Sequence, residues 1–184
     1  MSRIWLIRHG ESIRKPGSVI GVTDPPLSDA GIEQARRLGA AMAAHPLVRV
    51  LSSDRRRALA TARLVAQAHR LHVETTVALR EIDFGAWEGR SLADLWSEEP
   101  EAARAWEEDL RSTPSSFGES LSDLESRVAT FWSSLRPLPA VGEVAIVAHR
   151  GSLAVLGALI TGSPIAEAFA SGLELGAAVA LVAA

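Results

Sequence analysis

Two short apolar runs, one near each end of the chain, constrain the fold more than any other feature of this sequence. Residues 4–7 and 144–148 are wholly apolar; the first run stops at Arg8 and His9, and the second stops at His149. A short continuous apolar run is typical of a strand buried on both faces of a parallel sheet. Sites in open α/β sheets form at the carboxyl ends of strands. We therefore expect the two histidines to converge if their strands are neighbours.

Helical and extended patterns alternate between these two strands. Further strands are predicted at 48–51 and 72–77. Helices are predicted from an N-cap at Ser28 to before Pro46, from near Asp54, over 91–97, 101–110 and 121–135 with a capping box of Ser122 and Glu125, and over 152–160. Residues 81–89 have no clean period and read as a functional loop, and 112–118 read as a surface loop. The order predicts one domain over residues 1–184, a three-layer α/β sandwich with helices on both faces of a mostly parallel sheet.

Composition narrows the chemistry and the setting. The chain has 184 residues and a net charge of −3, so bulk charge does not attract nucleic acid. It has no Cys and no Tyr, which leaves five His, the carboxylates and the single lysine, Lys15, as acid, base or nucleophile. The apolar runs are far shorter than the roughly 20 residues that span a bilayer, and the first is too short for a signal peptide. We expect a cytoplasmic protein that does not enter a membrane.

Three segments carry candidate chemistry, each with a plainer alternative. Arg8, His9 and Gly10 suit anion binding, or simply cap a strand end. Three arginines at 55–57 open a helix where a bound anion would offset their repulsion by the helix dipole; alternatively they form a solvated face. Because successive helical residues point about 100° apart, at most one or two face a common pocket. Glu81 is a candidate general acid in a partly desolvated loop, or a surface charge.

The chain resembles the histidine phosphatase superfamily, also called phosphoglycerate mutase-like, through ordered blocks that span nearly all of it. The blocks are Leu6-Ile7-Arg8-His9-Gly10-Glu11-Ser12, Asp24-Pro25-Pro26-Leu27-Ser28-Asp29-Ala30-Gly31, Ser52-Ser53-Asp54 with Arg57-Ala58, Leu79 to Gly89, and Gly118-Glu119-Ser120 with Val147-Ala148-His149. The loop after Glu81 and the Gly-Glu-Ser block look most like α-ribazole phosphatases and their broad-specificity relatives.

The resemblance implies hydrolysis of a small phosphorylated metabolite through a phosphohistidine on His9, with α-ribazole 5′-phosphate as a candidate. Arg8 and Arg57 would hold the phosphoryl oxygens, and protonated His149 would stabilise the transition state. Glu81 would protonate the leaving oxygen and then activate water. Two further substrate-binding positions would be Ser12 and Gly21. The resemblance implies no metal or other cofactor, and a homodimer is a candidate assembly.

Three positions depart from the family pattern. Arg150 stands where Gly usually follows the second histidine, Lys15 replaces a common Asn, and Arg55 replaces a common Leu. Arg150 is strained if that position needs a positive φ; otherwise it contacts phosphate or faces solvent. Two other functions stay open. A phosphomutase would use the same residues, although the short segment after the Glu81 loop favours a phosphatase, and a non-catalytic phospholigand-binding module would follow if Arg150 distorts His149.

Overall fold

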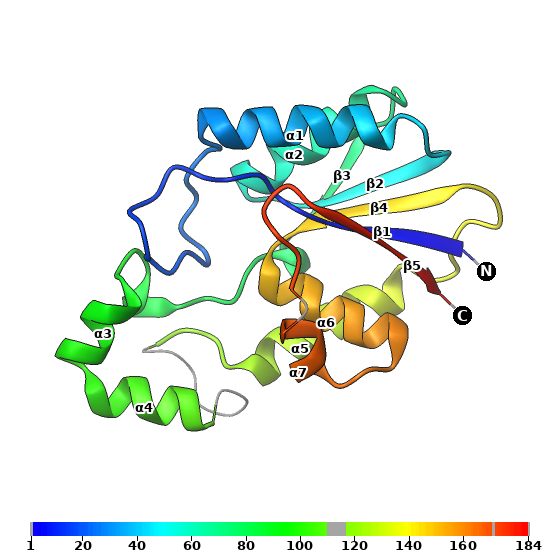
Figure 1. Cartoon of the computed structure of the whole chain (residues 1–184). Coiled ribbons are helices and arrows are strands. Elements are labelled where there is room, and N and C mark those ends of the chain that lie inside the picture. Colours follow the sequence, from blue (N-terminus) through cyan, green and yellow to red (C-terminus); the bar gives the residue numbers. More distant parts are fainter. Residues whose placement is uncertain (1, 110–116, 171, 184) are drawn as a thin grey trace.

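The computed structural model describes residues 2–109, 117–170 and 172–183. In these ranges the chain forms a five-stranded sheet in the order β3-β2-β4-β1-β5 (Figure 1). The strands are β1 (Ser2–Arg8), β2 (Leu47–Ser53), β3 (Val73–Thr76), β4 (Glu143–Ala148) and β5 (Ala178–Ala183). Strands β1 to β4 are parallel, and β5 pairs antiparallel with β1 at the sheet edge.

Helices cover both faces of the sheet, so the predicted three-layer α/β architecture is confirmed. Helices α1 (Asp29–Met42) and α2 (Arg56–Gln67) lie on one face, and α5 (Leu121–Ser134) and α6 (Arg150–Thr161) lie on the other (Figure 1). The central strand β4 is buried along its whole length. Its Val144 and Ile146 pack in the cluster with α5 and α6, whereas Ala145 and Val147 pack in the cluster with α1 and α2. This two-sided burial is why the strand reads as a continuous apolar run.

Helix caps explain where two of the helices begin. The Ser28 hydroxyl accepts a hydrogen bond from the Gly31 N–H at the start of α1, as the sequence predicts. The capping box of α5 was wrongly placed at Ser122 and Glu125. It is formed by Ser120 and Asp123, because the helix already begins at Leu121.

The described part of the segment between β3 and α5 lies beyond the carboxyl ends of the parallel strands (Figure 1). It holds the 3₁₀ turns η1 (Val77–Leu79) and η2 (Gly85–Trp87) and the helices α3 (Leu92–Glu98) and α4 (Pro100–Glu108). The surface loop predicted at 112–118 falls mostly on residues 110–116, outside the described residues. Helix α7 (Ile165–Ala170), which packs on α6, and strand β5 were not predicted. Within the described ranges, no helix is both long and apolar enough to cross a membrane.

Candidate active site

The two histidines meet at the carboxyl ends of neighbouring strands. Strands β1 and β4 pair with Arg8 opposite Ala148, so His9 and His149 emerge side by side. Their ring centroids are 5.0 Å apart, and the residues are only 7% and 1% exposed. The expected convergence is therefore confirmed.

One carbonyl determines which nitrogen of His9 is reactive. Nδ1 lies 2.6 Å from the Gly10 carbonyl oxygen, and because a carbonyl only accepts, Nδ1 must carry the proton. The lone pair then resides on Nε2, which lies 3.3 Å from the Nε–H of Arg57. Burial, together with the charges of Arg57 and Arg8, lowers the pKa of His9 to about 3. The imidazole is thus neutral and its Nε2 is free to act as a nucleophile.

Of the three consecutive arginines, Arg57 is the one that points into the site. It lies on the first turn of α2 and is 1% exposed, whereas Arg56 is exposed and Arg55 is half-buried. Its Nη1 and Nη2 donate to the carbonyl oxygens of Thr23 and Gly21, each at 2.8 Å. Burial lowers the pKa of Arg57, and the nearby carboxylate of Glu81 works against that shift. This separation of roles along the helix matches the expectation from side-chain directions.

Arg8 supplies the second guanidinium. Its Nη1 donates to the Leu173 carbonyl oxygen at 2.8 Å, and its Nε is buried with no hydrogen-bond partner among the described residues. Burial lowers the pKa of Arg8, again opposed by Glu81. A buried, unsatisfied N–H of this kind is costly unless an anion binds to it.

His149 is oriented by a serine from the neighbouring strand. Its Nε2 lies 2.9 Å from the Ser53 hydroxyl, and its Nδ1 is buried with no partner in the described part of the chain. Burial, with smaller effects of His9 and Arg57, lowers the pKa of His149 well below its ordinary value. Nδ1 is therefore the nitrogen available to a ligand.

Glu81 is held between two elements. Both of its carboxylate oxygens lie 3.1 Å from the N–H of Gly151 at the start of α6, and Oε1 also accepts from the N–H of Ile82. A Cβ at residue 151 would lie 2.3 Å from Oε1, so any side chain there would require this carboxylate to move. The site thus places a carboxyl group, two guanidiniums and two imidazoles together, the set that phosphoryl transfer through histidine requires.

Comparison with known proteins agrees with this geometry. The family model of the histidine phosphatase superfamily (branch 1) matches residues 4–183. The chain belongs to this superfamily. It is 34% identical to an adenosylcobalamin/α-ribazole phosphatase of Salmonella typhimurium over 175 residues, covering 95% of this chain and 87% of that protein.

One further relative carries a different activity in its name, and one solved structure is also similar to this chain. A probable phosphoglycerate mutase GpmB of Proteus mirabilis is 32% identical, covering 89% of this chain and 77% of that protein. The solved structure of a putative α-ribazole-5′-P phosphatase from Escherichia coli superposes with a TM-score of 0.90 at 33% identity, covering 97% of this chain and 89% of that one. The chain is a phosphatase that acts on a small phosphorylated metabolite, with the predicted phosphoglycerate mutase-like fold.

Gly10, Ser12 and Gly21 make backbone contacts within this histidine phosphatase. The Gly10 N–H donates to Thr61, and a Cβ on Gly10 would lie 2.4 Å from the Gly31 carbonyl oxygen, so this glycine admits helix α1 rather than a ligand. Ser12 is buried and bridges Leu27 in a short antiparallel pair. Gly21 donates its N–H to Glu88. Substrate contact by Ser12 and Gly21 stays a prediction.

Two of the departures from the family pattern, Arg150 and Lys15, leave the phosphatase site intact. Arg150 is the first residue of α6 and has no positive φ, so the strain considered from the sequence does not arise. It is exposed, and its Nη2 donates to the Phe169 carbonyl oxygen. Lys15 is exposed and lies 3.7 Å from Asp94. His149 keeps its contact with Ser53.

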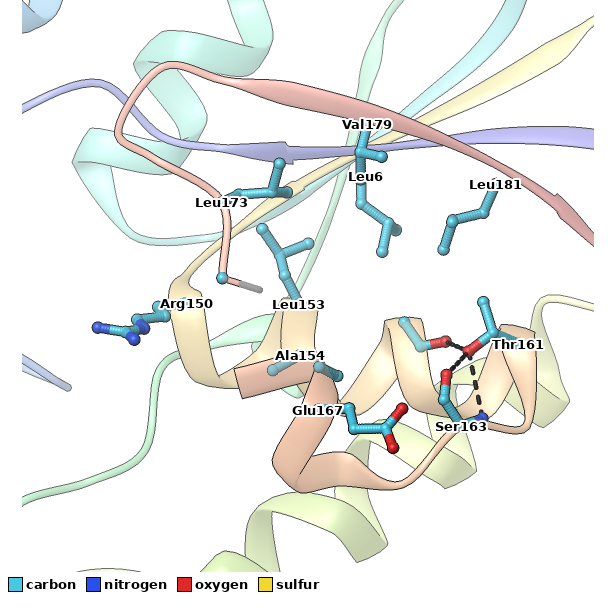
Figure 2. Close-up of a pocket in the computed structure, with 13 residues that line it drawn as sticks. Leu6, Arg150, Leu153, Ala154, Thr161, Ser163, Glu167, Leu173, Val179 and Leu181 are labelled. Atoms are coloured by element: carbon cyan, nitrogen blue, oxygen red, sulfur yellow. Dashed lines mark hydrogen bonds between the residues drawn. The ribbon is translucent and has the colours of Figure 1, made fainter. Parts of the chain in front are cut away.

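A separate apolar cavity of about 400 Å³ lies between α6, α7 and the strands β1 and β5 (Figure 2). Leu6, Leu153 and Leu181 point into it, whereas the Arg150 guanidinium points away. Its described lining contains none of the five side chains expected to act on phosphate. The Leu173 carbonyl, which accepts from Arg8, connects the wall of the cavity to the site.

Several residues that build the site were not identified as functional from the sequence. Ser53, Glu88 and Glu119 lie in the motif blocks, which predict no role for them, and Arg127 lies outside the blocks. Their signal is weak because each acts on a distant segment: Arg127 donates to the Glu81 carbonyl oxygen across 46 positions of the chain. In the described ranges, no three His, Asp or Glu side chains are placed to share a metal ion.

Proposed function

We propose that this histidine phosphatase hydrolyses phosphomonoesters through a covalent phosphohistidine on His9. The observation that carries the proposal is the Nε2 lone pair of His9, which the Gly10 carbonyl fixes and which faces the buried guanidinium of Arg57. Arg8 lies next in the chain with a buried, unsatisfied N–H. This arrangement supports a nucleophile surrounded by donors for phosphoryl oxygens.

In the first step the His9 Nε2 attacks phosphorus and the phosphorus–oxygen ester bond breaks. The protonated Glu81 carboxyl gives its proton to the leaving oxygen, and the Gly10 carbonyl stabilises the imidazolium through Nδ1–H. In the second step water attacks phosphorus, the Glu81 carboxylate takes a proton from that water, and the nitrogen–phosphorus bond breaks. Inorganic phosphate leaves and Glu81 is protonated again.

Charge in both transition states falls on the phosphoryl oxygens. Arg8, Arg57 and the Nδ1–H of His149 are the groups we assign to it. A bound dianion raises the pKa of His149, so its protonation accompanies substrate binding. These cations replace the divalent ion used by many phosphoryl-transfer enzymes.

The candidate substrate is α-ribazole 5′-phosphate, because α-ribazole phosphatases are among the proteins to which this chain is similar. A phosphomutase is the second candidate, because one relative at 32% identity carries that name. The two differ in the fate of the phosphoryl group: a phosphatase gives it to water, and a mutase returns it to the substrate.

Trapping the intermediate tests the proposal. Rapid quenching during turnover of a ³²P-labelled phosphomonoester should give an adduct on His9 that is acid-labile and base-stable. His9→Ala should lose both adduct and turnover, while the exposed-residue control His72→Ala should keep both. An adduct on His149, or full activity of His9→Ala, would overturn the assignment. A panel that includes α-ribazole 5′-phosphate and 3-phosphoglycerate separates free phosphate from isomerised product.

Setting and assembly are further proposals. A cytoplasmic setting is proposed for the enzyme, and the net charge of −3 argues against a nucleic acid partner. A homodimer is proposed as the assembly. Cell fractionation tests the first, a gel-shift assay the second, and light scattering coupled to gel filtration the third.

A further inference from the structure

We infer that Glu88 is a positioning residue for Arg57, and that it acts by holding the backbone of residues 21–23. This inference rests on the proposed role of Arg57 in binding the phosphoryl group. The Glu88 carboxylate accepts from the N–H groups of Gly21 at 3.0 Å, Val22 at 2.9 Å and Thr23 at 3.0 Å. It also accepts from the Thr23 hydroxyl at 2.5 Å and from the Phe84 N–H at 3.2 Å. One carboxylate thus satisfies five donors from two loops.

The same backbone segment holds the guanidinium from its other side. The carbonyl oxygens of Gly21 and Thr23, whose N–H groups bind Glu88, accept from Nη2 and Nη1 of Arg57. The third nitrogen, Nε, faces Nε2 of His9. Three short links therefore run from Glu88 through the segment 21–23 to the phosphate-binding guanidinium and the nucleophile.

Residues 21–23 pack closely against the loop that carries Glu88. A Cβ at Gly21 would lie 1.9 Å from the Ile82 carbonyl oxygen and 2.5 Å from the Glu88 Oε1. The segment therefore lies directly against the loop that carries both Glu88 and the candidate acid Glu81. Removal of the carboxylate would leave several backbone N–H groups without partners at this contact, which is costly for groups sheltered from water.

The ionised carboxylate is the feature that matters. Burial opposes ionisation of Glu88, but hydrogen bonds from Thr23, Val22 and Phe84 outweigh it and hold the pKa below its usual range. Gly21, Val22 and Phe84 donate to Oε1, while the N–H and hydroxyl of Thr23 donate to Oε2. A glutamine must therefore turn its NH₂ group toward donors, whichever way it is oriented.

A positioning role predicts a loss that depends on Arg57. Glu88→Gln should lower kcat/KM for p-nitrophenyl phosphate about tenfold and raise the inhibition constant of inorganic phosphate by a similar factor, as expected for removing 1 to 2 charge-assisted hydrogen bonds. In the Arg57→Ala background the same change should cost less than about twofold, because coupled residues are not additive. A purely structural residue would lower both backgrounds equally.

Two variants complete the test. Glu99→Gln is the matched control. In the described part of the chain, Glu99 binds Trp87 and Arg90 but makes no hydrogen bond to residues 21–23, so the activity of this variant should match the wild type. Thr23→Val removes one donor to Glu88 from an exposed side chain and should give a smaller loss in the same direction. Circular dichroism and thermal melting check folding, and Thr23→Val decides the matter if Glu88→Gln does not fold.

The outcomes separate this inference from the proposed function. An additive loss in the double variant, a Glu88→Gln no worse than Glu99→Gln, or an unaltered phosphate inhibition constant would overturn the positioning role alone. Wild-type activity in Arg57→Ala would overturn the proposed role of Arg57, and the inference with it.

Discussion

At the scale of single residues, hydrogen bonds to each histidine decide which nitrogen meets the substrate. The Gly10 carbonyl fixes a proton on Nδ1 of His9 and leaves Nε2 as the proposed nucleophile. Ser53 engages Nε2 of His149 and leaves Nδ1 facing the site. The two rings therefore present different nitrogens to the site. His9 presents Nε2 with its lone pair, which suits nucleophilic attack, and His149 presents Nδ1, which can carry a proton and stabilise charge.

Glu81 should act mainly on poor leaving groups. If it protonates the leaving oxygen, Glu81→Gln should slow phosphohistidine formation from alkyl phosphates by about 10² to 10⁴, the usual range for general acid catalysis. Formation from p-nitrophenyl phosphate should change far less, because nitrophenolate needs little protonation. Single-turnover kinetics measure this step apart from hydrolysis of the intermediate.

Asp83, two residues further on, is the matched comparison. Its carboxylate accepts from the Gly85 N–H, so it caps the loop and Asp83→Asn should not depend on the leaving group. A uniform loss in Glu81→Gln would assign Glu81 to binding or water activation only. A leaving-group-dependent loss confined to Asp83→Asn would move the acid to that residue.

At the scale of elements, the pairing of β1 with β4 brings the histidines together, and α5 places the acid. Arg127 on α5 donates to the carbonyl oxygens of Ala78, Arg80 and Glu81, at 2.8 to 2.9 Å. Its Nε and Nη2 also bind both oxygens of Glu119, which in turn accepts from the Asp83 N–H. Helix α5 thus holds the whole turn that carries Glu81.

Replacing Arg127 by lysine should weaken that turn without removing its charge. A lysine has one nitrogen and cannot reach three carbonyls and a carboxylate in fixed geometry. Arg127→Lys should lower turnover of alkyl phosphates about tenfold, and that of p-nitrophenyl phosphate less, since the loss passes through the acid. Arg37→Lys on α1, at an exposed pair with Glu33, is the control and should leave turnover unchanged. Equal losses for the two substrates would contradict a role through Glu81.

At the scale of the whole molecule, the buried histidines couple catalysis to stability. Both have folded-state pKa values below the ordinary value, that of His9 at about 3. Below about pH 6.5 the unfolded chain binds a proton on each ring, whereas the folded chain does not protonate His9 until near pH 3 and protonates His149 only well below pH 6.5. The free energy of unfolding should therefore fall as pH decreases through this window, by up to about 1.4 kcal/mol per pH unit for each histidine.

Urea unfolding at several pH values measures this slope. His9→Asn removes one depressed group and should give a shallower dependence, whereas His72→Asn, at an exposed position, should keep the wild-type slope. An unchanged slope in His9→Asn would show that His9 titrates normally in the folded protein.

Chelation tests whether turnover needs a divalent metal ion. Because Arg8, Arg57 and His149 supply the positive charge assigned to the phosphoryl group, EDTA should leave turnover of p-nitrophenyl phosphate unchanged. Activity that is lost on chelation and restored by a divalent ion would contradict this.

Local sequence patterns correctly predict the strands that end at His9 and His149, the start of α1 at Ser28, and the layered α/β class. These follow from local causes: an apolar run marks a doubly buried strand, and a hydroxyl at an N-cap satisfies a free N–H. The family motifs added the identities of the candidate nucleophile, arginines and acid, because chemistry of this kind requires particular side chains in a particular order.

Two features depend on the tertiary structure alone: β5 pairs antiparallel at the edge of the sheet, and Glu88 and Arg127 hold the loops around the site. Glu88 reaches residues 21–23 across more than sixty positions, and Arg127 reaches Glu81 across 46. Such contacts depend on how helices pack on the sheet, and the local hydrophobic periodicity of the sequence does not predict them.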